Sequence, residues 1–276
     1  MGRKIVRRRI VRATLDGARS EREEKLAVEE PLEIRFGSTP FTTSMRTPGD
    51  DFDMVAGFLL AEGIITRAEH LVAMRYCAGT DEEGNQTFNV IEVQLGFGAQ
   101  APDLSAARHV VTSSACGICG TNSIDEVRKK SHYALEPAAG MVELETLLAM
   151  PDTLREAQQL FSATGGVHAA GLFGTDGKLL VLREDVGRHN AVDKVIGAAL
   201  REGLLPLGET VLQVSGRASF ELVQKAAMAG IPVLSAVSAP SSLAVELAQQ
   251  SGLTLAAFSR TSSVNLYTHA QRVLGA

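Results

Sequence analysis

The C-terminal part of the chain alternates between short apolar runs and longer stretches that carry apolar residues at helical spacing. The short runs predict β-strands over 178–186, 209–216, 231–238 and 253–260. Between them, the pattern predicts helices over 190–203, 219–230 and 240–252. The strand runs are too continuously apolar to leave one face in water. This pattern predicts an α/β fold with a largely parallel sheet that helices cover on both faces.

The first part of the chain has a mixed pattern. Residues 29–37 alternate between apolar and polar side chains like a strand, and 87–98 are rich in β-forming residues. The stretch 46–65 between them indicates a turn followed by a helix. We therefore expect a smaller N-terminal α+β region over 1–104 and an α/β domain over 105–276.

The N-terminus mixes basic and apolar side chains. Its basic residues are Arg3, Lys4, Arg7, Arg8, Arg9 and Arg12. They could form a basic arm that meets an acidic partner, or an edge strand whose charges are solvated. The interleaved isoleucines and valines favour the edge strand.

Composition limits the classes of function. The chain has 276 residues, of which 45% are hydrophobic and 21% charged, and this is enough apolar material for a sizeable core. A net charge of −5 and an aromatic content of 5% argue against nucleic-acid binding. No apolar run reaches the roughly 18 residues of a membrane span. Three cysteines do not make a disulfide framework, so we expect a reduced, cytoplasmic protein.

Four loops that follow the predicted strands are rich in glycine, serine, arginine and aspartate. They cover 183–190, 215–219, 238–242 and 258–263. Ligands of open α/β sheets bind beyond the carboxyl ends of the strands, so these loops predict a polar binding edge. The chain contains neither of the two common glycine-rich nucleotide motifs, so no standard nucleotide fingerprint identifies the ligand.

Two of these loops place cationic side chains where a helix begins. Arg188 and His189 open one predicted helix, and Arg217 precedes the next. Such positions suit a phosphate or another anion. In the alternative interpretation, Glu184 and Asp185 pair with Arg188 in a network that only holds the loop together.

Three nearby polar residues have plainer interpretations. Asp193 and Lys194 fall on the first turn of the predicted helix, where we expect surface residues. His168 follows a pair of glycines. A lone histidine among small residues is more typical of a hydrogen-bonded core residue than of a catalyst, whereas the tight glycine pair before it favours a functional role.

The segment 113–130 contains Cys116 and Cys119 as a C-x-x-C motif in which a glycine, Gly117 or Gly120, follows each cysteine. Ser123 and Glu126 then form a capping-box pattern, which predicts that a helix begins just after the cysteines. The positive end of that helix would lower the pKa of a nearby thiol and raise its reactive thiolate fraction.

Three functions of this motif remain open on residues alone. A structural zinc site needs four ligands, and the motif supplies two without a second C-x-x-C, so we expect no metal. A dithiol oxidoreductase would use both thiols, although the motif lies outside the regular strand–helix region. A sulfur carrier would hold a persulfide on one cysteine while the other assists.

Several runs together resemble the FdhD family of formate dehydrogenase accessory sulfurtransferases. The most specific is EDVGRHNAVDKVIG, which follows the SSACGICG loop downstream in the chain. The others are EEPLEIR, RTPGDDFDMVAGFLLAEGII, TGGVHAA, SGRASFELVQKAAMAGIPVLSAVSAPSSLAVELA and YTHAQR. They extend over most of the chain from residue 29 to residue 272.

The resemblance implies a cytidine deaminase-like, three-layer core and a homodimer. It also implies a function: the protein takes persulfide sulfur from a cysteine desulfurase and delivers it to the molybdenum bis(molybdopterin guanine dinucleotide) cofactor. This sulfuration is needed for formate dehydrogenase activity. Two alternatives are a chaperone that binds the cofactor without handling sulfur and the dithiol oxidoreductase.

The resemblance also implies roles for individual residues. Cys116 would carry the persulfide and Cys119 would be an accessory thiol. The family's guanine-dinucleotide stretch falls on Phe258, Ser259, Arg260, Thr261, Ser262 and Ser263. Together with this stretch, we expect Arg217, Arg188 and His189 to hold the cofactor.

Overall fold

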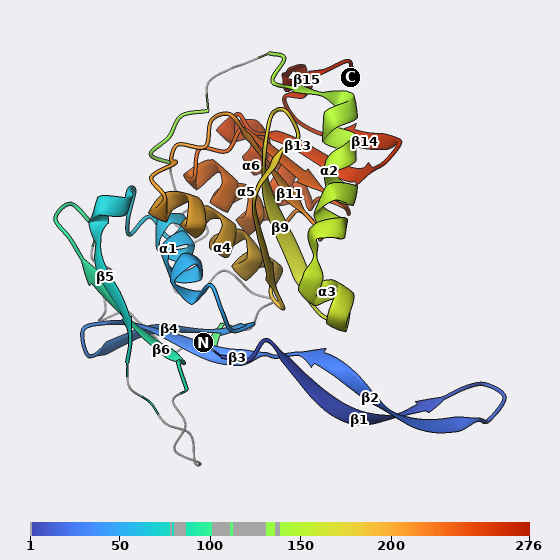
Figure 1. Cartoon of the computed structure of the whole chain (residues 1–276). Helices are drawn as coiled ribbons and strands as arrows, with labels where there is room; N and C mark the ends of the chain where they lie inside the picture. The colour runs from blue at the N-terminus through green and yellow to red at the C-terminus, as the bar shows by residue number, and fades with distance from the viewer. Residues whose placement is uncertain (1, 78, 80–86, 101–110, 113–130, 136–138) are drawn as a thin grey trace.

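The fold is that of a computed structural model, which describes residues 2–77, 79, 87–100, 111–112, 131–135 and 139–276. Its largest described sheet lies in the C-terminal part of the chain. Its six strands lie in the order β10-β9-β11-β12-β13-β14 (Figure 1). The strands are β9 (His168–Gly174), β10 (Leu179–Asp185), β11 (Thr210–Val214), β12 (Val233–Ala236), β13 (Thr254–Arg260) and β14 (Ser263–Leu266).

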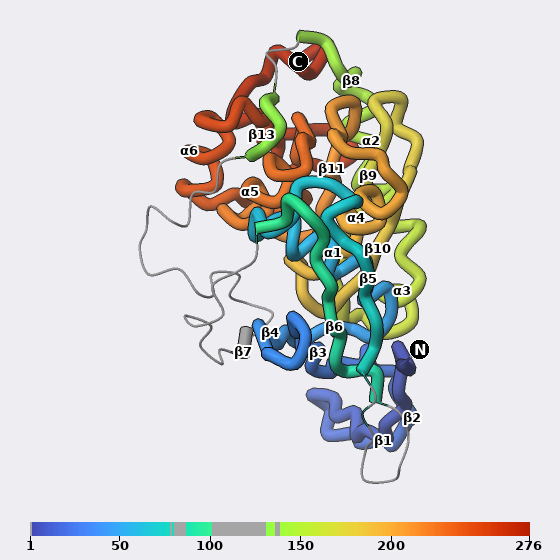
Figure 2. The backbone as a smooth tube through the Cα atoms, turned by 90° about the vertical axis from the view of Figure 1, so that its left-hand side faces the viewer, coloured from blue at the N-terminus to red at the C-terminus, as the bar shows by residue number. Residues whose placement is uncertain are grey.

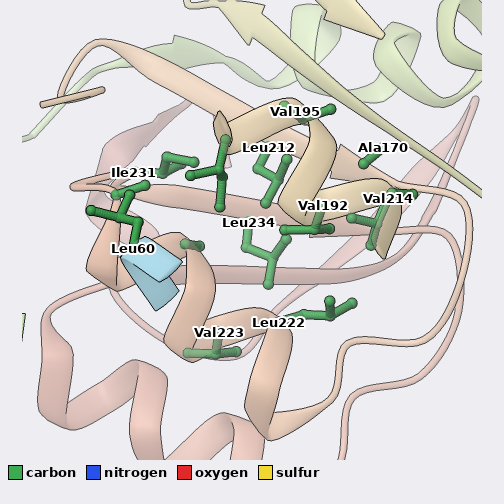
Figure 3. Packing of buried hydrophobic residues seen from close by; sticks show 14 of the residues in the cluster. Leu60, Ala170, Val192, Val195, Leu212, Val214, Leu222, Val223, Ile231 and Leu234 are labelled. Carbon is green, nitrogen blue, oxygen red and sulfur yellow. The ribbon is translucent and has the colours of Figure 1, made fainter. Parts of the chain in front are cut away.

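Helices pack on both faces of this sheet, as the apolar pattern predicts. The helices are α2 (Leu144–Ala157) with the short α3 (Gln159–Thr164) on one face, and α4 (Arg188–Arg201), α5 (Phe220–Met228) and α6 (Ser242–Ser251) on the other. Successive strand residues point to opposite faces. Val211 packs in the core beneath α2, whereas Leu212 packs in the core beneath α4 and α5 (Figure 3). The prediction of an α/β fold is confirmed.

The prediction of a largely parallel sheet is wrong. Two of the sheet's five pairings are parallel, β11 with β12 and β12 with β13. The other three are antiparallel. The physical reason for two of these is that short turns join β9 to β10 and β13 to β14, and a short turn can join only antiparallel strands. The third pairs β11 with β9, and β10 and α4 lie between these strands in the chain. The sequence pattern did not separate β9 and β14 from their surroundings. The cytidine deaminase-like likeness remains a prediction.

The N-terminal part forms a second sheet and a helix, α1 (Asp51–Ala61). This sheet has the order β5-β6-β3-β4-β7. Its strands are β3 (Glu30–Phe36), β4 (Thr39–Arg46), β5 (Leu71–Tyr76), β6 (Val90–Leu95) and β7 (Val111–Thr112). The predicted strands over 29–37 and 87–98 correspond to β3 and β6, and the predicted helix within 46–65 is α1.

Helix α1 crosses α4 at very short range because both helices carry a glycine at the crossing. A Cβ atom on Gly57 would lie 2.0 Å from the carbonyl oxygen of Asp193, and one on Gly197 would lie 1.8 Å from that of Asp53. Residues from both sides of the predicted domain boundary therefore share one hydrophobic core. The boundary between 104 and 105 lies outside the described residues and stays a prediction.

Two further strands, β1 (Ile5–Ala13) and β2 (Arg19–Ala27), form an antiparallel hairpin that projects from the body. Figure 2 shows that this hairpin lies at the end of the molecule away from the C-terminal pair formed by β15 (Val273–Leu274) and β8 (Val142–Glu143). The basic N-terminus is thus a strand with exposed charges, as expected. The remaining described elements are two 3-10 turns, Ala68–His70 and Ala270–Arg272.

None of the helices in the described part of the chain is both long and apolar enough to cross a membrane.

Candidate functional site

A cavity of about 770 Å³ lies at the edge of the six-stranded sheet where β11, β12 and β13 end. Ser215, Val237 and Arg260, which stand at these strand ends, belong to its lining. Strand β9 runs antiparallel to β11 and begins at this edge, so His168 belongs to the lining as well. The cavity therefore lies at the edge where the four polar loops of the sequence predict a ligand.

The end of β13 contributes Ser259, Arg260 and Thr261 to the cavity lining. The backbone is irregular here, because the register between β13 and β14 shifts just before Arg260 and Phe258 has a φ of 51°. A left-handed conformation is unusual for a bulky residue. β-bulges occur often beside binding sites because they redirect the side chains around them.

The other three residues of the predicted guanine-dinucleotide stretch lie outside the cavity lining. Phe258 is 36% exposed, and Ser262 and Ser263 are exposed in the turn and at the start of β14. The structure thus brings half of the stretch into the cavity lining and leaves the other half exposed outside it.

Ser259 combines burial with an unsatisfied hydroxyl. The residue is fully buried, and its Oγ atom has no hydrogen-bond partner among the described residues. Leaving a buried polar group unpaired costs roughly 1–3 kcal/mol. An unpaired atom in a cavity wall is explained if a ligand supplies the missing partner.

Another wall of the cavity comes from the junction of α2 and α3, which contributes Asp152, Arg155 and Phe161. The hydroxyl of Thr261 donates a hydrogen bond of 3.0 Å to the Asp152 carboxylate, which ties this wall to the end of β13. The Arg155 guanidinium lies 4.5 Å from the ring centroid of Phe161. This stacking orients a cationic group in the lining.

Glu184 fixes the start of α3. Its two carboxylate oxygens accept hydrogen bonds of 2.8 Å from the backbone N–H groups of Leu160 and Phe161. These N–H groups belong to the unpaired donors of a helix start, and a carboxylate is favoured there. Glu184 therefore holds the wall that carries Phe161, and it does not pair with Arg188 as the alternative interpretation supposed.

His168 lies half-buried in the cavity wall and not in the core, contrary to expectation. Burial lowers the pKa of its imidazole, and the nearby Arg188 and His189 lower this pKa further, while Asp185 opposes them. The ring is therefore neutral at pH 7. The loop after β11 passes beside the ring, since a Cβ atom on Gly216 would lie in ordinary van der Waals contact with its Nδ1 atom, at 3.5 Å.

Asp185 is the centre of a buried network beside the cavity. It forms an ion pair of 2.8 Å with Lys194 and accepts hydrogen bonds from the backbone N–H groups of Thr47 and Gly187. The side-chain amide of Asn190 donates another, at 3.0 Å. Asp185 thus joins the end of β10, the start of α4 and the loop after β4, which supports the structural-network interpretation for this residue.

The expectation that Asp193 and Lys194 lie on the surface is wrong. They are 3% and 1% exposed, because α4 is covered by α1 on one side and by α5 on another. Asp193 forms an ion pair of 2.7 Å with Lys225 of α5. Burial raises the pKa of Asp193, and Lys225 opposes this rise.

The cationic residues predicted at the helix starts lie outside the cavity lining. The Nε2 atom of His189 lies 2.5 Å from the Glu221 carboxylate and 3.2 Å from the Ser219 hydroxyl, so its ring faces the start of α5. Arg188 is partly buried, and Arg217 is exposed after β11. Their contacts with a cofactor stay a prediction.

Cys116 and Cys119 lie outside the described residues, so their predicted roles rest on the sequence. Within the described ranges, no group of three or more histidine, cysteine, aspartate or glutamate residues could hold a metal ion.

Sequence reasoning missed the wall formed by α2 and α3. The strand–helix rhythm begins only after this region, and the charged residues of α2 look like an ordinary solvated face. One usable signal was the glycine pair at 165–166, because Gly165 ends α3 in a left-handed conformation directly before the cavity residue Val167.

The chain is similar to known proteins over nearly its whole length. It is 57% identical over 273 residues to the sulfur carrier protein FdhD of Nocardia farcinica, which covers 99% of this chain and 96% of that protein. It is 56% identical over 256 residues to the protein of the same name from Mycobacterium tuberculosis, covering 91% of this chain and 92% of the relative.

The fold of the chain is also similar to that of a solved structure. The crystal structure of a protein from Desulfotalea psychrophila, described as a formate dehydrogenase accessory protein, matches with a TM-score of 0.75 at 27% identity. The match covers 99% of this chain and 100% of that chain. In addition, the sequence model of the FdhD/NarQ family matches residues 27–274. The chain therefore belongs to the FdhD/NarQ family.

Proposed function

We propose that this protein is a sulfur carrier that takes persulfide sulfur from a cysteine desulfurase and delivers it to the molybdenum bis(molybdopterin guanine dinucleotide) cofactor. The cofactor is cargo here, and it enters formate dehydrogenase after sulfuration. Membership of the FdhD/NarQ family and the names of the relatives support the sulfur-carrying role and the link to formate dehydrogenase. We further propose that the protein acts in the cytoplasm as a homodimer.

The observation that carries this proposal is the cavity at the end of β13. It is large enough for a nucleotide, and such sites are mostly apolar with a few placed polar groups. Leu154, Phe161 and Val237 supply apolar surface for a base or ribose. Arg260 supplies a planar cation for phosphate oxygens, and the unpaired Ser259 hydroxyl can form a hydrogen bond with the ligand.

The cofactor is larger than one nucleotide, so it extends beyond the cavity. We propose that Phe258, Ser262 and Ser263 contact it on the rim, and that Arg188 and Arg217 contact parts of it farther along the sheet edge. His189, which is held by Glu221, would position the start of α4 next to Arg188.

Sulfur loading requires one reactive thiolate. The Cys116 thiolate attacks the outer sulfur of the donor's cysteine persulfide. A new S–S bond forms on Cys116, the S–S bond of the donor breaks, and the donor cysteine leaves as a thiolate. This exchange changes no overall oxidation state.

Delivery of sulfide requires two electrons. In our proposal the Cys119 thiolate attacks Sγ of Cys116, so a Cys116–Cys119 disulfide forms and the outer sulfur leaves as sulfide for the metal. The two cysteines supply the electrons, and a small-molecule or protein dithiol reduces the disulfide before the next cycle. The residues of the cavity hold the guanine end of the cofactor during this step.

Intact mass spectrometry tests the proposal. The full chain is mixed with a cysteine desulfurase and cysteine without reductant, as wild type, Cys116→Ala and Cys119→Ala. We expect a reductant-sensitive gain of one sulfur atom in the wild type and in Cys119→Ala, and no gain in Cys116→Ala. If the wild type gains no sulfur while a control acceptor is loaded, the carrier function is wrong. The chaperone that binds cofactor without handling sulfur would then be favoured.

The same samples test the oxidoreductase alternative. If the chain reduces a disulfide substrate catalytically, needs both cysteines to do so and never holds a persulfide, the dithiol oxidoreductase replaces the carrier.

A further inference from the structure

We infer that Arg155 binds the diphosphate of a guanine nucleotide in the cavity, together with Arg260. This inference rests on the proposed function, because it takes the cofactor's guanine-dinucleotide end as the ligand. It adds a ligand-binding residue on α2, far in sequence from the stretch at 258–263.

Position is the first argument. Asp152 and Arg155 stand three residues apart on α2, so they share one face of the helix. Asp152 accepts a hydrogen bond of 3.0 Å from Thr261, the residue next to Arg260. Arg155 therefore lies one helical turn from the point where α2 meets the end of β13, and both arginines belong to the cavity lining.

Preorganisation is the second argument. The Arg155 guanidinium stacks on the Phe161 ring at 4.5 Å and donates one hydrogen bond of 3.2 Å to the Ser162 hydroxyl. A guanidinium has five N–H donors. Stacking fixes the plane of this group while other donors remain for oxygen atoms of a ligand. Phe161 is itself fixed, because Glu184 accepts the hydrogen bond of its backbone N–H.

Charge is the third argument. The chain carries a net charge of −5, yet the charged side chains of the lining are two arginines and one aspartate. The hydroxyl of Thr261 occupies one oxygen of that aspartate. The cavity is therefore a local excess of positive charge, and two planar cations suit the several oxygens of a diphosphate better than one.

Size and polarity identify the class of ligand. A cavity of about 770 Å³ is far larger than a free phosphate needs. Its apolar lining, which includes Leu154 and Val237, suits the base and ribose. The unpaired Ser259 hydroxyl offers a further hydrogen bond. A nucleoside diphosphate satisfies all these features, whereas an inorganic anion satisfies only the charge.

Isothermal titration of the full chain with GDP, GMP and guanosine tests the inference. We expect Arg155→Gln to weaken GDP binding by about 10- to 100-fold, as loss of charged hydrogen bonds does, while guanosine affinity stays within about twofold. Arg155→Lys keeps the charge but not the planar fork, so its loss should be intermediate. The matched control is Arg75→Gln, whose side chain is 73% exposed outside the cavity and pairs with Glu92. It should bind GDP like the wild type.

The outcomes separate this inference from the proposed function. If the wild type binds GDP and Arg155→Gln binds it equally well, the inference is wrong while the proposed cofactor site stands. Equal losses for GDP and guanosine would also overturn it, because the residue would then support the wall and not the phosphates. If the wild type binds no guanine nucleotide, the proposed cofactor site and this inference are both wrong, while persulfide loading of Cys116 still tests the sulfur step.

Discussion

The charged side chains around Asp185 and those that line the cavity have different partners. Asp185 has a cation and three N–H donors, and all of these groups are buried. In contrast, Arg155 and Arg260 line the cavity, and the Ser259 hydroxyl there has no hydrogen-bond partner among the described residues. The comparison separates charges that hold the fold together from charges that are free to hold a ligand. Asp185 and Arg260, one of each kind, occur in polar stretches that look alike in the sequence.

The largest expected effect comes from breaking the buried network. Lys194→Met leaves the Asp185 carboxylate buried without its cation, and such changes cost about 3–5 kcal/mol of unfolding free energy. Urea unfolding followed by circular dichroism measures the loss. The matched control is Arg7→Met, which breaks an exposed pair with Glu23 and should cost less than about 1 kcal/mol. A loss below about 1 kcal/mol in Lys194→Met would contradict the structural role of the network.

Removing the unpaired hydroxyl of the cavity should give the opposite result. We expect Ser259→Ala to leave the unfolding free energy unchanged or slightly higher, because the hydroxyl has no described partner to lose. GDP affinity should fall by about 3- to 10-fold, the value of one hydrogen bond.

Ser235→Ala is a close control for this change. Ser235 is also fully buried with an unpaired Oγ atom, but it lies in β12 outside the cavity lining. Its substitution should not change GDP affinity. If both variants behave alike towards GDP, the Ser259 hydroxyl does not contact the ligand.

A smaller effect concerns pH. The pKa of His168 lies below its ordinary value of 6.5 in the folded protein, because of burial, Arg188 and His189, with Asp185 opposing. Just below pH 6.5, His168 therefore binds more protons in the unfolded chain than in the folded protein. As a result, its neutral form contributes fully to stability above that pH, and this contribution is lost as the pH falls. Relative to His168→Gln, the wild type should therefore lose stability as the pH falls from about 6.5 towards the lower pKa of the folded protein. Unfolding free energies of both proteins across this range measure the difference, and parallel curves would contradict the lowered pKa.

The smallest effect is expected for an arginine outside the cavity. Arg217 is exposed, and GDP fills only the cavity, so Arg217→Gln should change GDP affinity by less than about twofold and stability by less than about 0.5 kcal/mol. Titration beside Arg155→Gln makes the contrast direct. A loss as large as that of Arg155→Gln would move the phosphate site towards the loop after β11.

Periodicity predicted the regular elements because burial sets their pattern. Residues 190–203 and 219–230 were recognisable as helices, and they form α4 and α5. Pairing direction was not recognisable, since β9 and β10 are joined by a short turn and apolar runs look alike in parallel and antiparallel strands. The edge of the sheet that carries the cavity was predicted because polar loops collect at the carboxyl ends of the strands.

The partners of individual charges could not be predicted. Lys194 looks like a surface residue until α1 covers α4, and that packing depends on Gly57 and Gly197, which are far apart in sequence. Arg155 likewise becomes a candidate only because the hydrogen bond from Thr261 to Asp152 brings α2 to the end of β13. Long-range contacts of this kind decide whether a charged side chain is structural or open to a ligand.

A crystal structure of the full chain with GDP is the most direct test of whether the charges of the cavity bind a ligand while those around Asp185 are structural. The account predicts nucleotide density in the cavity, with the diphosphate between Arg155 and Arg260 and a hydrogen bond to the Ser259 hydroxyl. It also predicts that the network around Asp185 stays unchanged. Density bound instead by Arg188 and Arg217, with the cavity left to solvent, would contradict the account.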